Sequence, residues 1–246
     1  MQNIIEEISA LIKACGAFIK EADRSCLQID EKAGHANFVT EYDKKVEKRL
    51  KDGLLQIIPE AKFIGEEGEG VHFSEKGMYF IVDPIDGTTN FIKDYHNSCI
   101  SVALITDGEA ALAFVYNPYL DELFTAQKGM GAYCNGKQIH VSRQPLENGV
   151  VLFGTSPYHE ELNEASFQMA YDYFKKALDI RRSGSAALDL CSVAAGRAEL
   201  YFELCLSPWD HAAGGLIVKE AGGIVTDIDG NPVRYDMPCS VLARNQ

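Results

Sequence analysis

The sequence lacks any apolar run of about 18 residues, the length that a membrane-spanning helix requires. Its first residues also lack the charged and then apolar pattern of a secretion signal, because acidic residues stand in the first turns of an amphipathic segment. We therefore expect a cytoplasmic protein that has no membrane partner.

Basic side chains are scarce in the sequence. There are 23 lysines and arginines against 36 aspartates and glutamates, which gives a net charge of −13. Such a charge repels nucleic acid and anionic membranes, so we expect no direct nucleic-acid partner. An anionic substrate would need a locally positive site, such as bound cations or the N-terminus of a helix.

Several chemical motifs are also missing. The seven cysteines form no CxxC pair and the six histidines show no paired spacing, which argues for reduced thiols and against a zinc site or a disulfide framework. The sequence has no GxSxG nucleophile elbow, no P-loop and no GxGxxG dinucleotide motif. These absences argue against the enzyme classes that those motifs define.

The sequence does have the composition of an ordinary globular protein, with 46% apolar and 24% charged residues in 246. This length suits a single domain of two tightly packed halves, about 1–145 and 146–246. Apolar spacing predicts helices at 2–22, 40–58, 160–177, 185–195 and 209–221, with a loop at 24–38. Strands are expected at 78–82, 99–105, 110–115, 122–126, 132–134, 149–154, 178–182, 200–204, 224–227 and 240–243. The pattern indicates a layered α+β architecture with an antiparallel meander around 78–142.

The run IVDPIDGTTNF, at residues 81–91, is the most informative motif. Asp83 and Asp86 follow a predicted strand and stand three residues apart, so a turn there can aim both carboxylates at one point. Gly87 and Thr88 come next, and their backbone N–H groups can bind an anion. A turn without any function is the simpler interpretation, since Asp, Pro and Gly all favour turns.

Two further acids favour a functional interpretation. Glu66 lies in IGEEG, another transition from apolar to acidic residues, and Asp210 opens a helix, where capping alone would also explain it. Clustered carboxylates repel by roughly 3 kcal/mol per pair at about 5 Å and an effective dielectric constant of about 20, unless protons or cations lie among them. Oxygen ligands without Cys or His favour Mg²⁺, with Mn²⁺ or Ca²⁺ as alternatives.

Other acidic motifs have simpler explanations. Asp43 completes the capping box TEYD, which is sufficient reason for its presence. Asp227 begins a run that resembles a calcium loop, but the twelfth position is Pro238 rather than glutamate, so we expect a turn. The Asp-x-x-Asp spacing of Asp83 and Asp86 differs from the Asp-x-Asp of phosphatases that form an aspartyl phosphate. This difference favours attack by metal-activated water without a covalent intermediate.

The motifs IGEE, DPIDGTTNF and WDHAAG, in this order and spacing, resemble those of the inositol monophosphatase family of Mg²⁺-dependent, lithium-sensitive phosphatases. The resemblance extends from about Thr40 to Ala243. It implies an αβαβα sandwich of the type shared with fructose-1,6-bisphosphatase, and a homodimer. It also implies two or three Mg²⁺ ions and inhibition by Li⁺ or Ca²⁺.

The resemblance further implies a role for individual residues. Metal ligands would be Glu66, Asp83, the Ile85 carbonyl, Asp86 and Asp210, with a third, weaker ion near Glu66. Water would be oriented or activated by Asp43, Thr88 and Glu66. Contacts with the substrate and its phosphate would come from Asp86, Gly87, Thr88, Gly184, Ser185, Ala186, Glu203 and Asp210. Lys32 would match a loop lysine of some members, and His211 departs from the small or apolar residue of many.

The leading hypothesis is hydrolysis of a small phosphorylated polyol or sugar, with myo-inositol monophosphate first, and Glu203 favours a polyol. Fructose-1,6-bisphosphate, histidinol phosphate, 3′(2′),5′-adenosine bisphosphate and NADP-type substrates stay open, because the motif sets the phosphate chemistry whereas loops set the leaving group. A second class of function is a regulatory role in transcription through a basic protein partner, since some relatives in the family bind transcription machinery.

Overall fold

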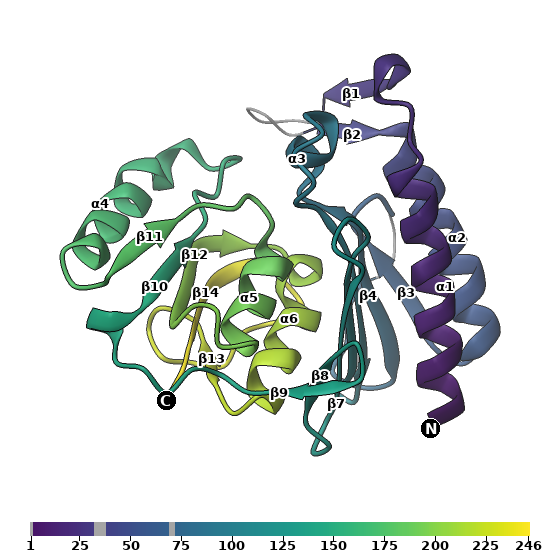
Figure 1. Ribbon diagram of the computed structural model, residues 1–246. Helices are drawn as coiled ribbons and strands as arrows, with labels where there is room; N and C mark the ends of the chain where they lie inside the picture. The colour runs from purple at the N-terminus through teal and green to yellow at the C-terminus, as the bar shows by residue number, and fades with distance from the viewer. Residues whose placement is uncertain (1, 32–37, 69–71) are drawn as a thin grey trace.

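The computed structural model describes residues 2–31, 38–68 and 72–246, which form alternating layers of helices and sheets (Figure 1). The outer helices α1 (Gln2–Lys20) and α2 (Glu41–Ile57) cover a seven-stranded sheet. Helices α5 (Ala186–Ala194) and α6 (Pro208–Glu220) separate it from a five-stranded sheet, and α4 (Asn163–Phe174) lies on the far side. The α+β sandwich with αβαβα layers is confirmed.

The seven-stranded sheet is the predicted meander, and its strands follow chain order from β3 to β9. They are β3 (Lys62–Gly65), β4 (Met78–Asp86), β5 (Cys99–Thr106), β6 (Glu109–Asn117), β7 (Glu122–Gln127), β8 (Ala132–Cys134) and β9 (Lys137–Ile139). Only β3 and β4 pair in parallel, and all other neighbours are antiparallel. Asp107, with a φ of 49°, and Gly108, with a φ of 81°, turn the chain between β5 and β6 as expected.

Strand β4 is apolar along its length because helices cover both faces of its sheet. Phe80 and Val82 belong to the core beneath α1 and α2, whereas Tyr79 and Ile81 belong to the core shared with α5 and α6. A strand that is buried on both faces has a continuous apolar run instead of alternation. Strand β4 therefore runs through the core and ends directly at the acidic motif.

The five-stranded sheet has the order β11, β10, β12, β14, β13. Its strands are β10 (Val150–Phe153), β11 (Asp179–Arg181), β12 (Leu200–Leu206), β13 (Ile224–Thr226) and β14 (Cys239–Arg244). Side chains from both sheets and from α5 and α6 form one hydrophobic cluster, so apolar packing is continuous from one half to the other. The division into halves near residue 145 within a single domain stays a prediction.

Some short elements were not predicted. The expected loop at 24–38 contains a 3₁₀ turn (Arg24–Cys26) and strand β1 (Ile29–Glu31), which pairs with β2 (Phe38–Thr40). Strands β3 and β9 and the short helix α3 (Thr88–Ile92) were also missed, because elements of three to five residues have too little periodicity to detect. The helix expected at 160–177 is a 3₁₀ turn (Glu160–Leu162) followed by α4. Within the described ranges, no helix is long and apolar enough to cross a bilayer.

The contact between α5 and α6 yields a stability prediction. A Cβ atom at Gly214 would lie 2.6 Å from the Leu190 Cβ atom, whereas one at Gly215 would meet only the Val225 Cγ1 atom, at 3.8 Å. We expect Gly214→Ala to lower the free energy of unfolding by about 1–3 kcal/mol through overpacking. Gly215→Ala should leave it unchanged or raise it by up to about 1 kcal/mol, because alanine favours helix. Urea denaturation measures both, and equal effects would contradict this close approach.

Candidate active site

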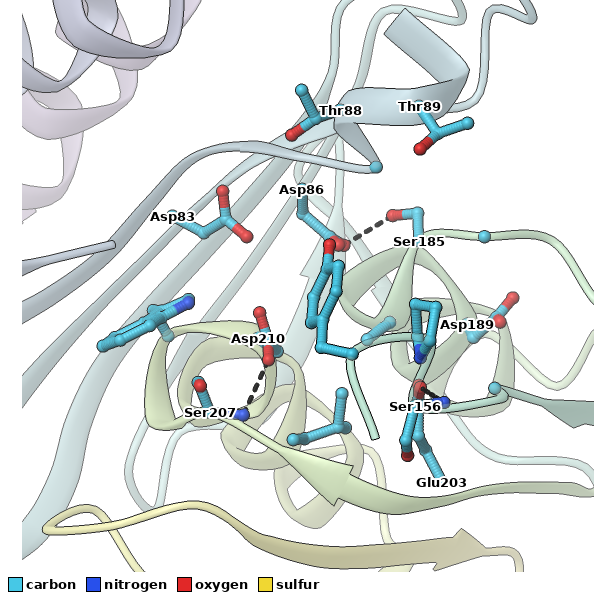
Figure 2. A pocket seen from close by; sticks show the side chains of 18 of the residues that line it. Asp83, Asp86, Thr88, Thr89, Ser156, Ser185, Asp189, Glu203, Ser207 and Asp210 are labelled. Carbon is cyan, nitrogen blue, oxygen red and sulfur yellow. Dashed lines mark hydrogen bonds between the residues drawn. The ribbon is translucent and has the colours of Figure 1, made fainter. Parts of the chain in front are cut away.

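Strand β4 ends in an irregular segment that carries two acidic side chains. Its pairing with β5 shifts register between Asp83 and Asp86, and the Ile85 N–H donates a hydrogen bond to Asp83 Oδ1 at 2.9 Å. Such a bulge re-aims the side chains of a strand. Both carboxylates are more than 90% buried and face the same space as Asp210 (Figure 2).

The chain changes direction at Gly87, between β4 and α3. Gly87 has a φ of 88°, and a Cβ atom there would lie 3.0 Å from the Gly184 carbonyl and 3.1 Å from the Asn97 carbonyl. Only glycine combines a left-handed conformation with such a close approach of two backbones. Thr88 and Thr89 therefore start α3 directly beside the two aspartates (Figure 2).

Asp86 connects the end of β4 to the start of the central helix α5. Its Oδ2 atom accepts hydrogen bonds from the Ser185 hydroxyl at 2.6 Å and from the Ala187 N–H at 2.8 Å. Ser185 is the N-cap of α5, so the carboxylate lies at the end of a helix where the dipole favours negative charge. These bonds engage Oδ2 and fix the orientation of the carboxylate in the cavity.

Asp210, at the start of helix α6, and Glu66, just after strand β3, reach the same cavity. Asp210 lies in the first turn of α6, and its Oδ2 atom accepts a hydrogen bond from the Ser207 N–H at 2.7 Å. It is the helix-capping residue that the sequence suggested, and it also lines the cavity. Glu66 follows β3, and its N–H donates to the Val82 carbonyl at 3.2 Å, which holds this turn against β4.

Glu47 supports the turn that carries Glu66, although the sequence did not single it out. Its Oε2 atom accepts a hydrogen bond from the Glu67 N–H at 2.8 Å, and a Cβ atom at Gly65 would lie 2.2 Å from the same oxygen. Glu47 follows Asp43 by four residues, so both acids lie on the buried face of α2. Two acids at helical spacing on an apolar face were the signal that could have identified Glu47.

Asp43 lies behind the cavity rather than in its lining. Its Oδ2 atom accepts hydrogen bonds from the Thr40 N–H at 2.8 Å and the Thr40 hydroxyl at 2.6 Å, which confirms the capping box. Its Oδ1 atom lies 3.4 Å from the Thr88 Oγ1 atom. Burial raises the pKa of Asp43 to about 7, against the opposing effect of the bonds from Thr40. Asp43 therefore takes part in capping α2 and also contacts Thr88.

The far end of the cavity belongs to the second half of the chain. Glu203, on β12, accepts hydrogen bonds from the Ser156 N–H and the Tyr201 hydroxyl, each at 2.7 Å. Burial raises its pKa, and the two hydrogen bonds partly offset that effect. The carboxylate is thereby held in place in the lining of the cavity, below Ser156 in Figure 2.

Asp189 and Arg182 also line the cavity, and both were missed from the sequence. Asp189 is 3% exposed in the first turn of α5, and burial raises its pKa well above the ordinary value. The Arg182 Nε–H donates to the Thr155 hydroxyl at 3.2 Å. Arg182 is the one Lys or Arg among the described residues of the lining. An acid within the small-residue run SAALDL was the available signal for Asp189.

These side chains surround a cavity of about 400 Å³ between the two halves. The predicted residues that line it are Glu66, Asp83, Ile85, Asp86, Gly87, Thr88, Gly184, Ser185, Ala186, Glu203 and Asp210. His211 is fully buried outside this lining. Lys32 lies outside the described residues.

The carboxylates raise one another's pKa values. Burial is the main cause for Asp83 and Asp210, followed by the negative charges of neighbours that include Glu66 and Asp86. Among the described residues, no three acid, His or Cys side chains are arranged closely enough to hold an ion as they stand. The donor chemistry nevertheless fits a hard divalent cation, because carboxylates and the Ile85 carbonyl supply oxygen alone and a cation would offset their repulsion.

A five-layer sandwich with an acid-lined cavity between its halves defines the class of protein, a metal-dependent phosphatase fold. The chain belongs to the inositol monophosphatase family, whose model matches residues 1–246. It is therefore a phosphatase of the family that the sequence motifs indicated.

Relatives in this family have different names. The chain is 44% identical over 200 residues to the Nus factor SuhB of Vibrio cholerae, a match that covers 80% of this chain and 74% of that protein. It is 35% identical over 244 residues to the inositol-1-monophosphatase of Bacillus subtilis, covering 98% and 92%. Family membership therefore leaves the particular role open.

Solved structures share the whole fold. The extragenic suppressor protein suhB of Bartonella henselae is 34% identical with a TM-score of 0.91, and the match covers 99% of this chain and 94% of that one. An IMPase/NADP phosphatase complexed with Mg²⁺ and phosphate is 25% identical with a TM-score of 0.88, covering 100% and 91%.

The raised carboxylate pKa values predict how stability depends on pH. Between the ordinary value of 3.8 and the raised values, about 7 for Asp43, the folded chain holds more protons than the unfolded chain. Stability should therefore fall as pH rises through this window in EDTA. Mg²⁺ replaces the protons, so it should raise Tm more at pH 8 than at pH 5, as thermal unfolding would measure.

Asp83→Asn supplies the control for this experiment. It should flatten the pH dependence in EDTA and reduce the Mg²⁺ effect on Tm. A Mg²⁺ effect that is the same at both pH values in the unmodified protein would contradict the interpretation.

Proposed function

We propose that this chain hydrolyses a small phosphate monoester with Mg²⁺, with myo-inositol monophosphate as the first candidate substrate. The observation that carries the proposal is the grouping of Asp83, Asp86 and Asp210 in one cavity whose far end holds Glu203. The Bacillus subtilis relative, an inositol-1-monophosphatase, supports this substrate. Fructose-1,6-bisphosphate, histidinol phosphate and phosphorylated nucleotides remain alternatives, and the IMPase/NADP phosphatase with the same fold supports the last of these.

Two groups of oxygen ligands would hold Mg²⁺. Glu66, Asp83 and the Ile85 carbonyl would form one site, and Asp83, Asp86 and Asp210 the other, with a third ion near Glu66. Bound Mg²⁺ would lower the pKa of a water molecule and neutralise the charge of the phosphate. The solved relative with Mg²⁺ and phosphate supports this cofactor, and Mn²⁺ as a substitute and Li⁺ or Ca²⁺ as inhibitors stay predictions.

Thr88 and Asp43 would orient the attacking water. The Thr88 hydroxyl hydrogen has two acceptors, the Ile85 carbonyl at 3.2 Å and Asp43 Oδ1 at 3.4 Å, so the oxygen lone pairs can accept a hydrogen bond from water. Because the pKa of Asp43 is raised to about 7, its carboxylate can take up a proton near neutral pH. Glu66, at the first metal site, would take part in activating the same water.

The opposite end of the cavity would bind the leaving group. Glu203 and Asp189 can accept hydrogen bonds from sugar or polyol hydroxyls, and Gly184, Ser185 and Ala186 would lie beside the ring. Gly87 and Thr88 would bind the phosphate through backbone N–H groups. Because Glu203 is fixed by two donors, its free acceptor positions have a defined direction.

A second role, in transcription, is supported by the 44% identical Nus factor SuhB. This relative weighs against the expectation, drawn from the net charge alone, that the chain has no direct nucleic-acid partner. A net charge of −13 repels the phosphate backbone overall, but it does not exclude a local contact or a basic protein partner. The homodimer and the cytoplasmic location stay predictions.

The enzyme proposal is tested by phosphate release from a panel of substrates with Mg²⁺. The panel contains inositol monophosphates, fructose-1,6-bisphosphate, histidinol phosphate, adenosine bisphosphate and NADP. We expect a clear preference for inositol monophosphate that is lost in EDTA and in Asp86→Asn, because that change removes a carboxylate from the second metal site. Normal activity of Asp86→Asn would refute the site, and a different preferred ester would refute the substrate.

The water-orienting role of Thr88 has its own test. Thr88→Ala should lower kcat by about 100-fold, since a positioned proton-transfer group contributes at least that much. Thr88→Ser keeps the hydroxyl and should retain most of the activity. The Mg²⁺-induced change in Tm should be similar in both variants. Equal kcat values for the two variants would show that the Thr88 hydroxyl does not orient the attacking water.

A further inference from the structure

Tyr158 lies among the carboxylates of the cavity, yet no part of the mechanism above uses it. It follows β10 in the segment 154–159 and lines the cavity together with Glu66, Asp83, Asp86 and Asp210. Tyr158 is 50% exposed and lines the cavity, so a ligand there can reach it. The residue comes from the second half of the chain, whereas Glu66, Asp83 and Asp86 come from the first.

The phenol lines the same cavity as the four acids of the proposed metal sites. Partial burial raises the pKa of Tyr158, and the next causes are the negative charges of Glu66, Asp210, Asp83 and Asp86, in that order. A phenol is protonated at neutral pH even without such a shift, so the Oη atom offers an O–H donor to this space.

This donor has no hydrogen-bond partner among the described residues. The four acids nearby are acceptors, but none accepts a hydrogen bond from Tyr158. A donor that faces a ligand cavity and has no protein acceptor can bond to water or to the ligand. In this cavity, the strongest acceptor that the proposed reaction brings is the phosphoryl group of the substrate.

The segment before Tyr158 is firmly attached to β12. Ser156 has a left-handed φ of 43°, which is unfavourable for a residue other than glycine. Its N–H donates to Glu203 Oε1 at 2.7 Å. Its hydroxyl donates to the Cys205 carbonyl at 3.1 Å and accepts from the Cys205 N–H at 2.9 Å. These bonds hold Ser156 in the strained conformation.

Two further contacts flank Tyr158. The Arg182 Nε–H donates to the Thr155 hydroxyl at 3.2 Å, and the His159 Nε2 atom lies 3.4 Å from the Cys205 Sγ atom. Tyr158 therefore stands between anchored residues on both sides, which fixes the position of its backbone at the edge of the cavity.

We propose that Tyr158 contacts the substrate by donating a hydrogen bond to a non-bridging oxygen of its phosphoryl group. This proposal rests on the proposed phosphatase function. The first half of the chain would hold the phosphate through Gly87 and Thr88, and Tyr158 would add a contact from the second half. The contact is common to all phosphate esters, so it would contribute to phosphate affinity and not to the choice of leaving group.

The test compares Tyr158→Phe with Tyr171→Phe. Both changes remove one phenolic hydroxyl, but Tyr171 lies on the outer helix α4, outside the cavity. For Tyr158→Phe we expect kcat/KM to fall about tenfold for every accepted substrate, the loss of one charge-assisted hydrogen bond. The Kd of inorganic phosphate with Mg²⁺, measured by calorimetry, should rise by a similar factor. Tyr171→Phe should stay within twofold of the unmodified protein in both.

Other results would overturn the proposal. An unchanged Kd for phosphate in Tyr158→Phe would do so, and so would a loss of kcat/KM confined to one leaving group. The calorimetry does not depend on turnover. If the unmodified protein releases no phosphate from any ester but Tyr158→Phe still weakens phosphate binding, the proposed activity fails while the contact stands.

Discussion

The site depends on one electrostatic constraint, the burial of several carboxylates in a cavity with little positive charge. Asp83, Asp86 and Asp210 are held in place by backbone N–H groups and by the Ser185 hydroxyl, so they cannot turn away from one another without losing hydrogen bonds. Their mutual repulsion raises the free energy of the folded chain unless protons or cations are bound. Affinity for a divalent cation and destabilisation of the cation-free protein at neutral pH are thus two consequences of the same arrangement.

Side chains at the end of β4 and in α3 also connect the seven-stranded sheet to the segment that leads into α5. Asp86 accepts hydrogen bonds from the start of α5, and the Asn90 side chain donates to the carbonyls of Asn97 at 2.8 Å and Ser183 at 2.9 Å. The central helices α5 and α6 pack against both sheets in one continuous core. A change in the packing of this layer would therefore move Asp210 relative to Asp83 and Asp86, although the residues that change need not line the cavity.

The two ends of the cavity have different consequences for function. The end with Asp83, Asp86 and Asp210 is the proposed metal site, which any phosphate ester would use, so it would indicate the reaction class and not the substrate. The far end, with Glu203, Asp189 and Arg182, is where leaving groups would be distinguished. Relatives named as a Nus factor and as an inositol-1-monophosphatase show that one fold carries different roles. Assignment of this chain to one role depends on measurements at that far end and on its partners.

The layered fold class, most long elements and most of the acids that line the cavity could be predicted from the sequence, because these features are local. Apolar periodicity marks helices and strands, and Asp83, Asp86, Gly87 and Thr88 are adjacent in one motif. Tertiary structure decided the rest. Strands β3 and β9 are too short to be recognised without their neighbours, and Glu47, Arg182 and Tyr158 have no motif around them. Arg182 and Tyr158 line the cavity, and Glu47 supports the turn that carries Glu66, because elements far apart in the chain pack together. That proximity depends on the whole core rather than on local sequence.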